Sequence, residues 1–118
     1  ADGGATYHQR YSSWELVRGQ AIDRWKAVVN PDTDSLKSKF HQMQHHRTNY
    51  MINREFMLEE EDYCSPQLFN LADEFLQVNY KSDNWLLQLE CFDPHEPFHA
   101  PERFRQKYET SYKGPILD

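Results

Sequence analysis

The clearest pattern of apolar and polar positions in this chain lies between residues 65 and 79. Ser65 suits a helix N-cap, and Pro66 suits the first helical position, because proline lacks the N–H that would be unpaired there. Apolar residues then recur with the 3.6-residue period of a helix, at Leu68, Leu71, Ala72, Phe75 and Leu76. The pattern therefore predicts an amphipathic helix, followed by a turn over residues 81–84.

A period of two follows this helix. The predicted strand is Trp85–Phe92, with Leu87, Leu89 and Cys91 on one face and Leu86, Gln88, Glu90 and Phe92 on the other. Gln88 and Glu90 indicate that the strand is only partly buried. The prolines of Asp93–Pro97 end it, because proline cannot donate to a β-ladder.

Two further helices are predicted on either side. The break at residues 30–32 precedes a helix that Asp34 or Ser35 would cap. One face of that helix carries Leu36, Phe40, Met43 and Arg47, and the helical tendency continues less regularly through residues 50–58. Pro101 opens a short helix with Phe104 and Tyr108 on one face. An order of helix, strand, loop and helix is typical of α/β proteins, although one strand is too few to form a sheet.

Composition changes this picture in one respect. The chain has 118 residues, enough for one domain, and 17 of them are aromatic, whereas Leu, Ile, Val and Phe together number only 24. Few aliphatic side chains are present to pack around the aromatic ones. We therefore expect either a partner or a missing remainder of the fold, and the start at Ala1 suggests a cut or processed end.

Charge and cysteine content exclude several classes of function. Thirteen basic and 19 acidic residues give a formal net charge of −6, which disfavours nucleic-acid binding and attachment to an anionic membrane surface. We find no apolar run long enough for a membrane span. Cys64 and Cys91 are expected to be free thiols, since a disulfide scaffold would need more cysteines. The chain carries no compartment signal, and the cytoplasm is taken as the default.

Patterns that resemble metal sites are explained more simply. His95–His99 has the H-E-x-x-H form of zinc proteases, but Pro94 and Pro97 prevent the helix that this motif needs. The side chains of His41, His45 and His46 fit a solvated helix face, because no further ligand stands at a suitable spacing. The acidic run at residues 59–62 fits a solvated surface.

The loop after the predicted strand is the best candidate for chemistry. His95 lies just past the carboxyl end of that strand, where α/β sheets bind ligands, and the flanking prolines restrict the loop. These residues leave two roles open for His95, a ligand contact and a structural one.

A family resemblance adds to this interpretation. The segment from Asn84 to Phe98, with its Phe-Asp-Pro-His-Glu-Pro run, resembles the strand and Pro-His-x-Pro loop of bacterial sulfatases in the alkaline phosphatase superfamily. The resemblance covers nearly the whole chain and includes residues 2–8, 14–20 (with Arg-Gly-Gln at 18–20), 60–63 and 73–76. Ala21 and Ile22 depart from it, standing where the family has Glu and Gly.

The resemblance implies a fold and an activity. The fold class is then α/β: a helix-rich internal fragment of an alkaline-phosphatase-like sulfatase domain with few strands of its own, residues 1–118 being one partial domain. The full enzyme would hydrolyse sulfate esters through a formylglycine nucleophile and a divalent metal, usually calcium. His95 matches the catalytic, substrate-binding histidine that contacts the sulfate.

The same resemblance implies what this chain lacks. Cys64–Leu68 is similar to the Cys-x-Pro-x-Arg nucleophile signature of sulfatases, but Leu68 stands where the Arg should be, so Cys64 is expected to be an ordinary thiol at a helix start. No metal ligands of the family are present. We therefore expect the chain alone to be inactive and to self-associate through the unpaired edges of residues 85–92. Two alternatives stay open: a phosphonate or phosphate ester hydrolase of the same superfamily, and a non-catalytic interaction module.

Overall fold

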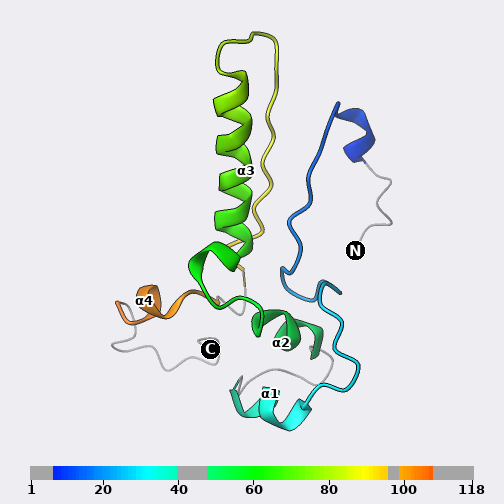
Figure 1. Cartoon of the computed structure of the whole chain (residues 1–118), viewed down its shortest axis with the longest axis vertical. Coiled ribbons are helices and arrows are strands. Elements are labelled where there is room, and N and C mark those ends of the chain that lie inside the picture. Colours follow the sequence, from blue (N-terminus) through cyan, green and yellow to red (C-terminus); the bar gives the residue numbers. More distant parts are fainter. Residues whose placement is uncertain (1–6, 40–47, 96–98, 108–118) are drawn as a thin grey trace.

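A computed structural model of the chain describes residues 7–39, 48–95 and 99–107. Within these ranges all regular structure is helical, and no strand occurs (Figure 1). The elements in chain order are the 3₁₀ helix η1 (Tyr7–Arg10), α1 (Thr33–Lys39), α2 (Thr48–Arg54), the 3₁₀ helix η3 (Glu60–Asp62), α3 (Cys64–Asn79) and α4 (Glu102–Arg105). The expectation of a helix-rich chain is thus confirmed.

The longest helix, α3, matches the 3.6-residue pattern. It begins at Cys64, one residue before the predicted cap, and Tyr63 takes the extended N-cap conformation. The predicted turn follows its end: the Ser82 amide donates to the Asn79 carbonyl at 2.9 Å, and Asn84 has a φ of 63°. Ser65, the predicted cap, lies inside the helix, so that assignment is wrong, whereas the apolar period and the closing turn located the helix.

The predicted strand Trp85–Phe92 is wrong. The segment is extended and runs back along α3, but no β-ladder pairs it within the described residues (Figure 1). Its contacts with the helix are side-chain contacts: the Phe75 and Trp85 rings meet edge to face at 5.3 Å, and Ser65 Oγ lies 3.3 Å from Cys91 Sγ. Alternating apolar residues predict an extended backbone, whereas a strand also needs a neighbour for its N–H and C=O groups.

A small core joins α1 and α2. Leu36, Met51 and Ile52 are buried together, with Met51 fully inaccessible to solvent. The capping residue of α1 is Asp32, whose Oδ1 accepts from the Ser35 amide at 3.0 Å, and neither predicted cap fills that role. Asp32 is the cap because the helix begins directly after it, at Thr33.

Several sequence predictions extend past these elements. The end of α2 at Arg54 leaves residues 56–58 outside the helix that was expected to include them. The histidines at 41, 45 and 46 lie outside the described residues, as do Phe40, Met43, Arg47 and Tyr108, so the helical faces predicted for them are not described.

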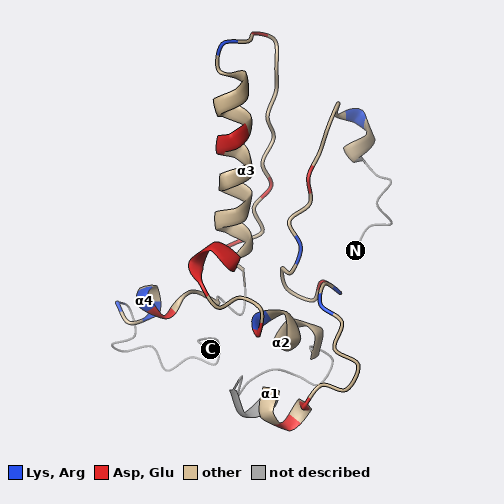
Figure 2. Ribbon diagram, in the orientation of Figure 1, with Lys and Arg blue, Asp and Glu red and all other residues tan. Residues whose placement is uncertain are grey.

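Much apolar surface is left uncovered. The chain exposes 9424 Å², whereas a folded monomer of its mass exposes about 6,800 Å². α3 carries only two charged residues, Asp73 and Glu74, whereas all three residues of η3 are acidic (Figure 2). Large exposed apolar residues on α3 and the segment beside it are Phe69, Leu71, Leu76, Val78, Trp85, Leu86, Leu89 and Phe92. None of the described helices has both the length and the apolar character of a membrane span.

Candidate functional site

A tight turn over residues 18–23 forms one side of the candidate site. Arg18 binds the Asp23 carboxylate through two bonds, Nε to Oδ2 at 2.7 Å and Nη2 to Oδ1 at 2.8 Å. The Gly19 amide donates to the same Oδ2 at 2.8 Å. The bond from Arg18 is the main reason that the pKa of Asp23 is lowered, and partial burial opposes it. Gly19 has a φ of 110°, and a Cβ there would lie 2.7 Å from the Trp25 ring.

The turn is tied to α2 by a buried amide. Asn53 is fully inaccessible, and its Nδ2 donates to the Asp23 carbonyl at 2.7 Å and to the Gly19 carbonyl at 3.4 Å. Its Oδ1 accepts from the Lys26 amide at 3.2 Å. The Asn53 side chain therefore gives hydrogen-bond partners to backbone groups of residues 19, 23 and 26, which lie outside any helix. Buried polar groups need such partners.

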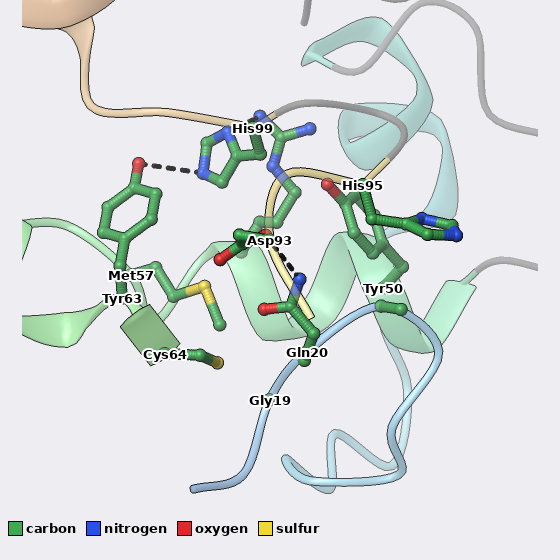
Figure 3. A pocket seen from close by; sticks show the side chains of 11 residues that line it. Gly19, Gln20, Tyr50, Met57, Tyr63, Cys64, Asp93, His95 and His99 are labelled. Atoms are coloured by element: carbon green, nitrogen blue, oxygen red, sulfur yellow. Dashed lines mark hydrogen bonds between the residues drawn. The ribbon is translucent and has the colours of Figure 1, made fainter. Parts of the chain in front are cut away.

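The turn at residues 18–20 and the loop at residues 93–95 meet in space. Gln20 Nε2 donates to Asp93 Oδ1 at 2.8 Å, although the two residues are 73 positions apart (Figure 3). Ser65, near the start of α3, donates its hydroxyl to Asp93 Oδ2. The Arg-Gly-Gln turn and the Asp-Pro-His loop thus form one surface.

His95 lies at the end of the extended segment and is exposed. Its ring stacks on Phe92, with centroids 4.3 Å apart and an angle of 29° between the ring planes. The sequence placed His95 just past the end of a strand, and that placement is wrong in so far as no strand forms; His95 follows an unpaired extended segment. An accessible, ring-stacked imidazole can donate to or accept from a solvent-borne ligand.

His99 takes a different environment. Its ring points toward Tyr63, away from the direction of the His95 ring (Figure 3). Arg54 Nη2 contacts Nδ1, and Tyr63 Oη lies 2.9 Å from Nε2. Because a guanidinium can only donate, Nδ1 must accept, and neutral His99 carries its proton on Nε2 and donates it to Tyr63.

Burial and two nearby positive charges keep His99 neutral. Burial is the main cause that lowers its pKa from 6.5 to about 3, and the charges of Arg54 and Arg105 act in the same direction. Burial also raises the pKa of Tyr63, an effect that Arg54 and Arg105 oppose. The cluster is therefore a neutral imidazole and phenol beside two cations, which suits a fixed support better than proton transfer at neutral pH.

A small cavity lies among these groups. It measures about 30 Å³, and a water molecule needs roughly 10–15 Å³ of such space. Its lining includes Gly19, Gln20, Tyr50, Asp93, His95 and His99 (Figure 3).

Cys64 and Cys91 are both free thiols, as expected. Cys64 is partly buried and its Sγ donates to the Arg18 carbonyl at 3.5 Å. Burial is the main cause that raises its pKa to about 11, and the charges of Asp93 and Asp23 add to the shift. A thiol held in its protonated form is a weak nucleophile.

Sequence reasoning passed over Asn53 and Arg54, which hold the two sides of the site. The only signal was their position, two polar residues directly after the apolar run Tyr50–Ile52, where a buried helical turn continues.

Within the described parts of the chain, no three His, Cys, Asp or Glu side chains lie close enough together to hold a metal ion. Comparison with protein-family models gave no match, and neither did comparison with curated proteins or with solved structures.

Proposed function

We propose that this chain is the central part of a bacterial sulfatase of the alkaline phosphatase superfamily, and that His95 contacts the sulfate group of the ester substrate. One observation carries the proposal. The Arg-Gly-Gln turn and the Asp-Pro-His loop, which together resemble that family, are joined by the bond from Gln20 to Asp93. Segments that build one site must meet in space, and these two meet although they are far apart in the sequence.

The chemistry of His95 fits this role. Sulfate-ester cleavage builds negative charge on the sulfuryl oxygens and the leaving group, and a fixed N–H donor lowers the barrier by stabilising that charge. His95 is exposed and stacked on Phe92, and this stacking orients its ring. In this chain His95 would bind and orient the sulfate.

The nucleophile and the cation would come from other parts of the enzyme. Cys64 has Leu68 in place of the family arginine and a raised pKa, so it does not fit the formylglycine position. The described residues offer no set of ligands for calcium, so the carboxylates that hold such an ion would lie elsewhere in the enzyme. The role of this chain is to supply His95 and the scaffold beneath it.

Kinetics of the sulfatase that contains this segment test the proposal. Replacing His95 by Ala should lower kcat/KM for an aryl sulfate by about a hundredfold to a thousandfold, the cost of losing one preorganised donor. His8→Ala is the matched control, because His8 stacks on Trp14 in the N-terminal part of the chain. A loss of less than tenfold for His95→Ala, or an equal loss for His8→Ala, contradicts the proposal. The 118-residue chain alone should show no turnover above a buffer blank.

The flanking gene sequence separates sulfatase from the related alternative. A Cys-x-Pro-x-Arg motif upstream supports the sulfatase, and its absence favours a phosphonate or phosphate ester hydrolase of the superfamily. A non-catalytic interaction module is the second candidate. It is favoured by the apolar surface that α3 and residues 85–92 expose, since large exposed patches mark binding surfaces.

A further inference from the structure

The loop that carries His95 is fixed on both sides of that residue. Two residues before it, the Asp93 carboxylate accepts one bond from Gln20 Nε2, at 2.8 Å, and another from the Ser65 hydroxyl. Asp93 therefore joins the loop to the turn at residues 18–23 and to the first turn of α3. We call these contacts the Asp93 anchor.

Four residues after His95, the His99 ring forms a second point of attachment. It contacts Arg54 through Nδ1 and Tyr63 through Nε2, and it stacks on the Tyr63 ring at 4.9 Å between centroids. His99 is part-buried here, whereas His95 is exposed. We call these contacts the His99 anchor.

Both anchors lead back to the same turn of α2. Asn53 holds the backbone of Gly19 and Asp23, which places Gln20 opposite Asp93. Arg54, the next residue, contacts His99 directly. Both Asn53 and Arg54 are buried, so their side chains have little freedom to move.

We infer that Gln20 and Tyr63 are positioning residues, which act with the last turn of α2 to hold His95 in place for its ligand. The Asp93 anchor lies two residues before His95 and the His99 anchor four residues after it, and together they hold the exposed imidazole of His95 in one orientation. The catalytic part of this inference rests on the proposed function, whereas the anchoring of the loop does not. Misplacing a catalytic group by about 1 Å can cost a hundredfold in rate.

The first experiment measures the loop in the 118-residue chain, with ¹³C- and ¹⁵N-labelled histidine. Tyr63→Phe removes only the hydroxyl from the His99 anchor, and Gln20→Ala removes one bond of the Asp93 anchor. Gln77→Ala is the matched control, since its bond to Asp73 at 2.6 Å lies on the exposed side of α3. Nuclear magnetic relaxation then gives the order of the His95 ring, and ¹⁵N shifts give the tautomer of His99.

We expect the order of the His95 ring to fall in both anchor variants and to stay unchanged in Gln77→Ala. In the unaltered chain, His99 should carry its proton on Nε2. An unchanged His95 order in both anchor variants, or an Nδ1–H tautomer of His99, overturns the anchoring.

The second experiment separates anchoring from catalysis in the sulfatase that contains this segment. Each anchor variant should lower kcat/KM for an aryl sulfate at least tenfold, and the loss should vanish when His95 is already Ala, because the anchors act through that residue. Full additivity of the two losses overturns the positioning role. Loss of His95 order in the chain, together with a normal kcat/KM for His95→Ala, supports the anchoring and overturns the proposed function.

Discussion

Acidification should unfold this protein through His99. The perturbation is protonation of an imidazole that lies against Arg54 and beside Arg105, in a part-buried position. Folding lowers the pKa of His99 from 6.5 to about 3. Between these two pH values the unfolded chain binds a proton at His99, whereas the folded chain does not. The stability that His99 contributes is therefore complete above pH 6.5 and is lost as the pH falls toward 3.

The size of this effect follows from the two pKa values. Between pH 7 and pH 5 the folded form stays neutral while the unfolded form becomes protonated, which removes about 2 kcal/mol from the free energy of unfolding. The lowered pKa of Asp23 acts in the same direction, but only at more acidic pH, because the ordinary pKa of that carboxyl is 3.8. Between pH 7 and pH 5 the His99 imidazole therefore acts before the Asp23 carboxyl does.

Urea unfolding followed by tryptophan fluorescence at pH 7, 6 and 5 measures the loss. His99→Gln should remove most of the pH dependence, and His8→Gln, the control, should keep it. An equal pH dependence in the unaltered chain and in His99→Gln would refute the reasoning. If His99→Gln does not fold, titration of the His99 ring protons in the unaltered chain decides the matter: a midpoint near pH 6.5 refutes it equally.

Two further predictions concern the cysteines and the exposed surface. Intact mass should show Cys64 as an unmodified thiol. At pH 8 Cys64 should react with iodoacetamide at least tenfold more slowly than the exposed Cys91, because the pKa of Cys64 is raised to about 11. A mass loss assigned to Cys64, or equal labelling of both thiols, contradicts this prediction. The chain should also self-associate, since it exposes 9424 Å², roughly 2,600 Å² more than a compact monomer of its mass. Light scattering at several concentrations should show a dimer or larger species that Leu86→Glu weakens and Val29→Glu, on the N-terminal side, does not; a monomer throughout counts against it.

Local signals explain which elements the sequence predicts well. α3 is found because its start, its apolar period and its closing turn all lie within about 20 residues of sequence. The predicted caps of α1, Asp34 and Ser35, lie two and three residues past the observed one, because they and Asp32 are all good capping residues and only the path of the backbone selects among them. The strand predicted at Trp85–Phe92 does not form, because a strand also needs a neighbouring strand to pair with, and the sequence of the segment cannot tell whether one is present.

In the candidate site, too, local features could be predicted from the sequence and long-range contacts could not. His95 could be singled out from its own loop, since the proline-flanked histidine is a local feature. The supports beneath it could not, because the contacts of Gln20 with Asp93 and of Arg54 with His99 join residues 73 and 45 positions apart. The different environments of His95 and His99 likewise depend on α2 and on Tyr63, which the H-E-x-x-H spacing does not include.

The buried amide of Asn53 has a consequence for the order in which parts of the molecule open. Its three bonds span 27, 30 and 34 positions, and they tie residues 19–26 to a helix. Segments held by a few long-range bonds tend to open as one cooperative unit at lower free energy than a packed core. Each opening of this unit would withdraw Gln20 from Asp93. The lifetime of the closed segment 19–26 then sets how long the Gln20 bond of the Asp93 anchor persists between one opening and the next.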